Sequence, residues 1–220
     1  ISRSSKSDIL KYYPDISRKK IEIIYPGGES ILFKNKTKKI GITKPYLLFV
    51  GSLKPIKNIN RLLDAYFNLP EKIKSTYQLV IVGNKEQTEE NIDQKIVKLE
   101  KLNQARYLGF VDDQTLVKLY KNAEIFISPS LYEGFGLPIL EAMACGCPII
   151  ASNTGSMPEV IGNAEILVNP LDTKDITKAI EKILTDKCLQ KDLRIKSLRR
   201  SKNFSWQTFS QKVYNIITEM

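Results

Sequence analysis

A chain of 220 residues is long enough to bury one hydrophobic core, and its 42% apolar and 9% aromatic content is typical of a folded globular protein. Its 34 lysines and arginines outnumber 24 acidic residues, for a net charge of +10, but no aromatic-interleaved basic stripe or zinc finger spacing supports a nucleic-acid partner. The lack of histidine excludes Ser/His/Asp and Cys/His catalysis from this chain, and three cysteines alone argue against a zinc site.

The positive charge is densest at positions 34–39 and 191–202. Such stretches attract anionic lipids or phosphate-bearing ligands, although a lysine-rich composition with solvated basic faces is the simpler explanation. No apolar run reaches the length of a membrane span. The chain begins with Ile1 rather than methionine, so we expect its natural N-terminus to lie upstream.

The first expected element is a short helix that begins at a serine cap and ends before Pro14. Strands are then predicted at the β-branched and apolar runs 21–25, 46–50, 78–82, 105–109, 124–128, 148–152 and 165–168. Helices are predicted between them at 58–69, 90–102 and 112–123, where apolar residues recur at helical spacing. This alternation predicts an α/β fold with a Rossmann-like doubly wound parallel sheet.

The last part of the chain is predicted to be helical, at 173–186, 188–203 and 205–220. The final helix carries an apolar side formed by Trp206, Phe209, Val213, Ile216 and Ile217. We expect this side, like the opening helix, to pack on something outside the sheet.

Ligands of doubly wound sheets bind where the strands end, so the turns after strands are the places to search. In "FVGSLKPIKNINRLL", Gly51 permits a close backbone approach, and Lys54 and Lys57 lie where a phosphate would meet the next helix. The turn matches neither a P-loop nor a dinucleotide fingerprint, and an ordinary turn with exposed lysines is the alternative. Gly83, after the next strand, would let a flat base lie against the backbone, or serve ordinary turn chemistry.

The stretch "YEGFGLPILEAMACGCPIIAS", residues 132–152, carries the strongest pattern. Pro138 suits the first helical position, and Gly146 ends the helix. The amides of 136–139 would then point out of a helix N-terminus and form an anion site. Glu133 lies before this site and Glu141 lies one turn into the helix.

Two carboxylates would repel a phosphate, but they suit the hydroxyl groups of a ribose and a sugar attached to its two ends. Simpler alternatives are a helix-dipole role for Glu141 and a solvated loop acid for Glu133. A glycosidase-type pair is disfavoured, because the adjacent amides and lysines indicate a phosphate leaving group.

This stretch closely resembles the signature of the group 1 family of retaining glycosyltransferases with the GT-B fold, whose two glutamates are separated by seven residues. Further blocks that resemble the family, in family order, lie at 49–66, 79–83, 108–130, 153–172 and 204–217. The resemblance implies the C-terminal, donor-binding half of a two-domain enzyme. It divides the chain into 1–26, a remnant of the N-terminal domain and linker; 27–204, the nucleotide-sugar-binding Rossmann-like domain; and 205–220, a helix crossing to the missing N-terminal domain.

The resemblance also implies residue roles. Glu133, which holds a donor-sugar hydroxyl, and Lys57, which holds the diphosphate, are the catalytic candidates, and Glu141 holds the ribose. The family usually has an arginine directly after the glycine, where this chain has Ser52, so Lys54 is a possible substitute. The implied substrate-binding positions are Glu141, Gly51, Ser52, Lys54, Gly83, the base-cradling Phe110 and Val111, and Gly134, Phe135, Gly136, Leu137 and Pro138.

A member of this family would move a hexose from a nucleotide-diphospho-sugar to a polysaccharide or lipid-linked glycan, with no cofactor and no metal. The likeness of "NAEILVNPLD" to mannosyltransferases favours GDP-mannose mildly. The expected location is the cytoplasm, with peripheral contact to the inner face of the membrane suggested by the basic charge. We expect this chain to be inactive without its N-terminal domain. The alternatives are a non-catalytic nucleotide-sugar-binding module and a nucleotide-sugar epimerase.

Overall fold

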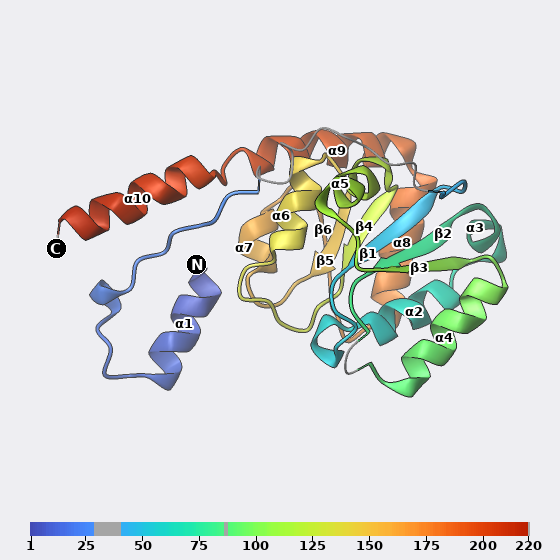
Figure 1. Ribbon diagram of the computed structural model, residues 1–220, viewed down its shortest axis with the longest axis horizontal. Coiled ribbons are helices and arrows are strands. Elements are labelled where there is room, and N and C mark those ends of the chain that lie inside the picture. Colours follow the sequence, from blue (N-terminus) through green and yellow to red (C-terminus); the bar gives the residue numbers. More distant parts are fainter. Residues whose placement is uncertain (29–40, 86–87, 220) are drawn as a thin grey trace.

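The computed structural model of the protein describes residues 1–28, 41–85 and 88–219. A six-stranded parallel sheet lies at its centre, with strand order β3-β2-β1-β4-β5-β6 (Figure 1). The strands are β1 (Tyr46–Val50), β2 (Gln78–Val82), β3 (Ala105–Gly109), β4 (Ile125–Ser128), β5 (Ile149–Ser152) and β6 (Ile166–Val168). The predicted doubly wound α/β fold is therefore confirmed, and its strand order is the one in which the winding direction reverses between β1 and β4.

Helices cover both faces of this sheet. The helices of the described residues are α1 (Arg3–Tyr12), α2 (Ile59–Phe67), α3 (Glu71–Thr76), α4 (Glu90–Lys101), α5 (Asp113–Asn122), α6 (Leu137–Ala144), α7 (Met157–Ile161), α8 (Thr173–Thr185), α9 (Lys187–Ser201) and α10 (Trp206–Thr218), of which α1 and α10 lie off the sheet. Apolar residues of α2, α4 and α8 form one core with the sheet, and those of α5, α6 and α7 form another on the opposite face. The sequence patterns located α2, α4, α5 and α8 because each of them buries several apolar residues at helical spacing. The short helices α3 and α7 were not predicted.

The strands are apolar along their length because both of their faces are covered. In β1, Leu47 and Phe49 point into one core while Tyr46 and Leu48 point into the other. All four of these side chains are buried. The parallel register of β1 with β2 pairs Tyr46 with Gln78, so that the two strands end at the same edge of the sheet.

One predicted strand is wrong. In the described segment 21–25, the backbone forms no strand. Its apolar residues pack elsewhere: the ring of Tyr25 lies 5.9 Å from that of Phe135 and 5.6 Å from that of Phe204. Ile23 and Ile24 border a cavity of about 500 Å³ beside α10. The apolar side chains of this β-branched run therefore pack against helices and loops from a connecting segment, and the run does not join the sheet.

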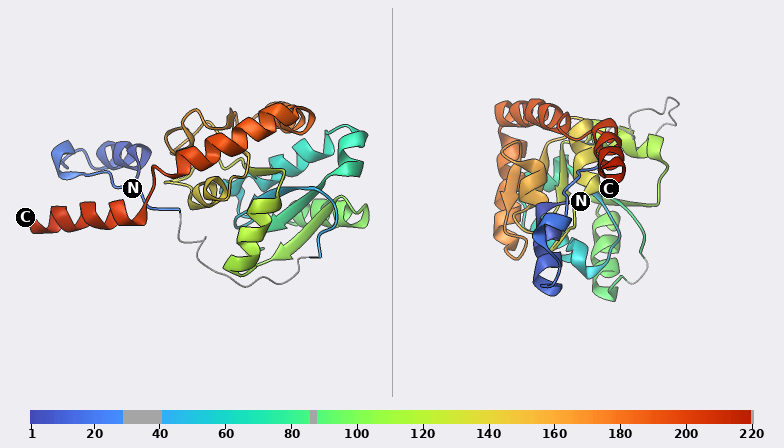
Figure 2. Two further views of the ribbon diagram at one scale, coloured as in Figure 1. Left: turned by 90° about the horizontal axis from the view of Figure 1, so that it is seen from above. Right: turned by 90° about the vertical axis from the view of Figure 1, so that its left-hand side faces the viewer.

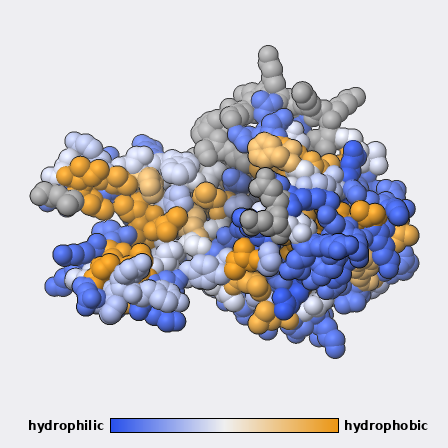
Figure 3. Space-filling model, turned by 60° about the horizontal axis from the view of Figure 1, so that its bottom comes forward, coloured by the Kyte–Doolittle hydropathy of each residue, from blue (hydrophilic) through white to orange (hydrophobic). Residues whose placement is uncertain are grey.

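The two ends of the chain project from the same side of the sheet (Figures 1 and 2). The expected opening helix is α1, with Ser2 as its N-cap, and the closing helix is α10. Figure 3 shows apolar atoms gathered on both projecting segments. Neither helix buries a residue within the described structure, as expected of elements that pack outside the sheet.

The remaining expectations on composition have mixed outcomes. The three cysteines are expected to be small buried thiols; all three are free, and burial raises the pKa of Cys145 to about 11, but Cys188 is exposed. The basic stretch at 34–39 lies outside the described residues. Among the described residues, no helix combines the length and the apolar composition that crossing a bilayer requires.

Candidate functional site

Three glycines close the carboxyl ends of β1, β2 and β3. The Gly51 N–H donates to the Val82 carbonyl and the Gly83 N–H donates to the Gly109 carbonyl, each at 2.9 Å. A Cβ atom on Gly83 would lie 1.8 Å from the Gly51 carbonyl oxygen, so no larger residue fits there. The close approach at Gly83 is therefore to the backbone of Gly51, and it joins the ends of β1 and β2.

The turn after β1 is tied to the turns after two other strands. It contains a short 3₁₀ helix, Pro55–Lys57, and then Asn58 in a left-handed conformation with φ of 57°. The buried Asn58 side-chain amide donates to the Pro129 carbonyl at 2.9 Å and to the Pro170 carbonyl at 2.7 Å. These bonds fix the turn after β1 beside those after β4 and β6.

We call residues 129–136, between β4 and α6, the acid loop. Glu133 in this loop forms an ion pair with Lys57 from the turn after β1. The same carboxylate oxygen, Oε1, accepts a hydrogen bond from the Ser130 hydroxyl at 2.9 Å. Both partners are partly accessible, with 24% of the Lys57 side chain and 17% of the Glu133 side chain exposed. The structure therefore brings the two catalytic candidates together at the point where the winding of the sheet reverses.

The helix that follows the acid loop departs from the prediction in two details. α6 begins at Leu137, so Pro138 occupies its second position rather than its first, and Gly136 is the N-cap with φ of 92°. The Ile139 N–H donates to the Gly136 carbonyl at 3.0 Å, and proline has no N–H to offer. The anion site predicted over 136–139 is thereby narrowed to the N–H groups of Gly136 and Leu137, because the other two positions contribute no free donor.

The other loop residues have distinct environments. The Gly134 carbonyl accepts a hydrogen bond from the Ser5 hydroxyl at 3.1 Å. The Phe135 side chain is buried and packs against Tyr25, so only its backbone faces the site. Leu137 is exposed at the start of α6. Among the remaining predicted positions, Lys54 is exposed beside the half-buried Ser52.

Glu141 lies one turn into α6 and faces α5. Its Oε2 atom accepts a hydrogen bond from the Tyr120 hydroxyl at 3.2 Å. Burial raises the pKa of Glu141, and the hydrogen bond from Tyr120 opposes this rise. Burial, followed by the charge of Glu141, also raises the pKa of Tyr120 well above its ordinary value. Tyr120 therefore stays a hydrogen-bond donor that orients the Glu141 carboxylate.

The end of β3 offers an open apolar surface. Phe110 is 89% exposed and is followed by the half-buried Val111. A hollow of about 420 Å³ borders Phe110 together with Asp112, Asp113 and Gln114. An exposed aromatic ring beside a hollow is a suitable surface for stacking a planar base.

Sequence reasoning missed several residues that support this site. They are Tyr120, Ser130, Gly155 and Ser156. The turn at 153–156 follows β5, so the rule that ligand chemistry gathers at strand ends would have pointed to Gly155 and Ser156. No sequence signal links Tyr120 to Glu141, since the two lie on different helices.

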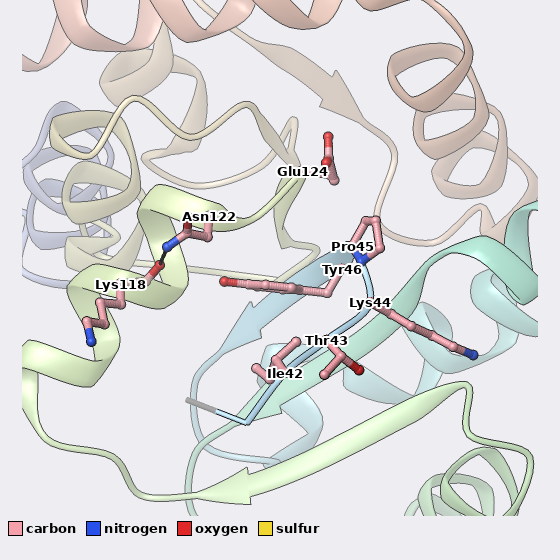
Figure 4. A pocket seen from close by; sticks show the side chains of 8 residues that line it. All are labelled: Ile42, Thr43, Lys44, Pro45, Tyr46, Lys118, Asn122 and Glu124. Carbon is pink, nitrogen blue, oxygen red and sulfur yellow. Dashed lines mark hydrogen bonds between the residues drawn. The ribbon is translucent and has the colours of Figure 1, made fainter. Parts of the chain in front are cut away.

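A second cavity of about 440 Å³ lies at the opposite, amino end of β1 (Figure 4). Its polar groups are engaged within the protein: the Tyr46 hydroxyl donates to the Leu119 carbonyl at 2.8 Å, and Lys44 donates to the Asn103 carbonyl at 3.2 Å. Glu124 accepts a hydrogen bond from Gln190 at 2.6 Å. The carboxyl end of the sheet is therefore the better candidate for ligand chemistry.

Comparison with known proteins agrees with the resemblance seen in the sequence. The chain is 38% identical over 170 residues to the O-antigen chain mannosyltransferase B of Escherichia coli. The aligned region covers 77% of this chain and 45% of that protein. It is 33% identical over 219 residues to the serotype-specific mannosyltransferase WbdA of Escherichia coli, covering 94% of this chain and 26% of that one. The chain thus spans less than half the length of either relative.

Among solved structures, Anabaena HepE in complex with UDP and glucose superimposes with a TM-score of 0.86 at 20% identity, over 100% of this chain and 62% of that one. This likeness shows the fold alone. Residues 33–200 match the family model for glycosyl transferases group 1. The chain belongs to the group 1 glycosyltransferase family.

Proposed function

We propose that this chain is the donor-binding part of a retaining glycosyltransferase that takes a hexose from a nucleotide-diphospho-sugar. The observation that carries the proposal is the contact of Lys57 with Glu133 where the sheet reverses, next to the N-terminus of α6. Membership of the family and the relatives' names, both O-antigen or serotype mannosyltransferases, support a hexose donor and a polysaccharide or lipid-linked glycan acceptor. GDP-mannose is the first donor to test.

The chemistry requires a diphosphate to leave while the sugar is held. An ammonium group has three N–H donors, so Lys57 can contact Glu133 and a phosphate oxygen at the same time. The N–H groups of Gly136 and Leu137, at the positive end of α6, supply further donors to the phosphate. Stabilising the departing nucleoside diphosphate in this way lowers the barrier to bond cleavage.

The two glutamates then have separate tasks. Glu133, already oriented by Lys57 and Ser130, accepts a hydrogen bond from a hydroxyl of the donor sugar. Glu141, oriented by Tyr120, accepts hydrogen bonds from the ribose. Phe110 and Val111 lie beneath the base. The sugar is transferred with retention of its anomeric configuration.

The same proposal covers cofactors, partners and location. Within residues 1–28, 41–85 and 88–219, no cluster of three or more histidine, cysteine, aspartate or glutamate side chains is placed to hold a metal ion. In this proposal Lys57 and the backbone amides of Gly136 and Leu137 stabilise the diphosphate. The acceptor and an N-terminal domain complete the active site, so the chain alone is inactive. Its net charge of +10 favours a cytoplasmic site beside the inner face of the membrane.

A thermal-shift screen of GDP-mannose, UDP-glucose and ADP-glucose tests this function. A ligand that binds only the folded state stabilises it by RT ln(1 + c/Kd), where c is the free ligand concentration, so at equal concentration the tighter ligand raises the melting temperature more. We expect GDP-mannose to give the largest shift and the Lys57→Met variant to lose most of it. Equal melting temperatures with and without all three donors would contradict the proposal.

A further inference from the structure

Helix α1 begins against the part of the protein that carries the acid loop. The backbone N–H groups of Arg3 and Ser4, at the start of α1, donate to the Glu159 carboxylate at 3.0 and 3.2 Å. The Ser2 hydroxyl oxygen accepts the next free donor, the Ser5 N–H, at 2.9 Å. Glu159 lies in α7, far along the sequence, and a carboxylate at a helix N-terminus satisfies unpaired donors and the helix dipole together. In Figure 1, the N-terminal end of α1 is the end nearer to α7 and the sheet.

The first turns of α1 also contact the acid loop on both sides of Glu133. The Ser5 hydroxyl donates to the Gly134 carbonyl at 3.1 Å. The Tyr132 hydroxyl donates to the Asp8 carboxylate. Residues 132 and 134 are therefore both attached to α1, while the carboxylate of Glu133 between them meets Lys57.

The turn that leads into α7 holds the acid loop from the other direction. The Glu133 carbonyl accepts two hydrogen bonds from the fully buried Ser156, from its N–H at 3.2 Å and from its hydroxyl at 3.0 Å. The Thr154 hydroxyl donates to the Leu131 carbonyl at 3.0 Å. A Cβ atom on Gly155 would lie 2.9 Å from the Glu133 carbonyl oxygen. One segment, 153–159, thus holds the acid loop at one end and caps α1 at the other.

We propose that Glu159 and Ser5 are positioning residues for the sugar half of the donor. Glu159 fixes the N-terminus of α1, and Ser5 on that helix fixes Gly134, so that the Glu133 carboxylate meets the sugar hydroxyl at the right place. The inference rests on the proposed function of Glu133. Of the groups assigned to the nucleotide, Glu141 on α6 and Phe110 after β3 belong to elements outside this chain of contacts, whereas the diphosphate donors Lys57 and Gly136 adjoin the acid loop. Disturbing α1 should therefore weaken binding of the sugar more than binding of the nucleotide.

Calorimetric titrations with GDP-mannose and with GDP test this division. We expect Glu159→Ala and Ser5→Ala each to weaken GDP-mannose binding about tenfold while the Kd for GDP rises by a clearly smaller factor, about threefold at most. Ser5→Thr, which keeps the hydroxyl, should restore binding. Asp186→Asn is the matched control, because Asp186 caps α9 by accepting the Leu189 N–H at 2.9 Å at the opposite end of the sheet. A parallel loss for both ligands, or no loss for either, overturns the inference.

Amide hydrogen exchange on the ligand-free protein gives a readout that does not depend on the donor. We expect the amides of 131–136 to exchange at least several-fold faster in Glu159→Ala than in the wild type or in Asp186→Asn, because the loop loses its hold on α1. Unchanged exchange at 131–136 would overturn the inference whatever the titrations give. If the wild-type protein binds neither GDP-mannose nor GDP, the donor proposal fails, and the exchange result still decides whether α1 holds the acid loop.

Discussion

Two glutamates at opposite ends of the same sheet have contrasting surroundings. At the carboxyl end, Glu133 is paired with the cation of Lys57 and remains partly open to solvent. At the amino end of β5, Glu165 accepts the Ile149 N–H at 2.7 Å and contacts the Ser197 hydroxyl. Burial raises the pKa of Glu165 to about 8, against the opposing hydrogen bond from the Ile149 N–H and the positive charges of α9.

Hydrogen-bond counting supports a neutral Glu165. The Ser197 hydroxyl lies 2.9 Å from the Cys147 carbonyl and also contacts Glu165, yet it has one proton to donate. Both contacts are satisfied when Ser197 donates to Cys147 and a protonated Glu165 donates to Ser197. At the amino end of the sheet, Glu165 is thus neutral and joins β5 to α9 through hydrogen bonds. At the carboxyl end, Glu133 is partly accessible and paired with Lys57, as expected of a residue that binds a ligand.

The largest expected effect comes from breaking the carboxyl end itself. Gly83→Ala places a Cβ atom against the Gly51 carbonyl at a backbone φ of 145°, and we expect it to lower the free energy of unfolding by about 4 kcal/mol. Gly41→Ala, where the nearest atom would be 3.7 Å away, is the matched control and should change stability by less than about 0.5 kcal/mol. Urea unfolding measures the stability of both variants. A Gly83→Ala protein as stable as the wild type would contradict the close approach of residue 83 to the Gly51 carbonyl.

The second prediction concerns the neutral acid. The folded protein keeps a proton on Glu165 up to a pH of about 8, while the unfolded chain releases it near 4.5. The folded state therefore binds more protons between these values, so stability falls as pH rises through this window. We expect the wild type to lose roughly 3 kcal/mol between pH 5 and pH 8.5 relative to Glu165→Gln. Urea unfolding at several pH values checks this, and identical pH profiles for the two proteins would show a charged Glu165.

The third prediction concerns the cation at the carboxyl end. Lys57→Met removes a charge-assisted bond to phosphate and should weaken GDP binding about 30-fold. Lys54→Met decides whether Lys54 substitutes for the family's arginine, which is Ser52 in this chain. A loss of GDP affinity similar to that of Lys57→Met would show that it does. Calorimetry measures both variants, and unchanged GDP affinity in Lys57→Met would remove Lys57 from the phosphate site.

The smallest expected effect isolates the ribose. If Glu141 holds the ribose hydroxyls, the wild type should prefer GDP to its 2′,3′-dideoxy analogue by roughly tenfold. Glu141→Gln should reduce that preference while keeping the helix intact. A Glu141→Gln protein that discriminates as well as the wild type would assign this carboxylate to α6 stability instead.

Much of this arrangement is predictable from the sequence because it is local. The apolar strands, Gly51, Gly83 and the acid loop all follow from runs and turns of neighbouring residues. Contacts between distant segments are not readable in this way, which is why Tyr120, Ser156 and the capping of α1 by Glu159 were missed. The hydrogen bond of Ile139 to Gly136 likewise depends on how tightly α6 begins, so the predicted anion site was too wide.

A crystal structure of the protein with GDP-mannose tests the central claim most directly. The account predicts the diphosphate between the Lys57 ammonium and the N–H groups of Gly136 and Leu137, the ribose on Glu141 and the sugar on Glu133. A donor bound instead at the amino end of the sheet, in the cavity of Figure 4, would contradict it.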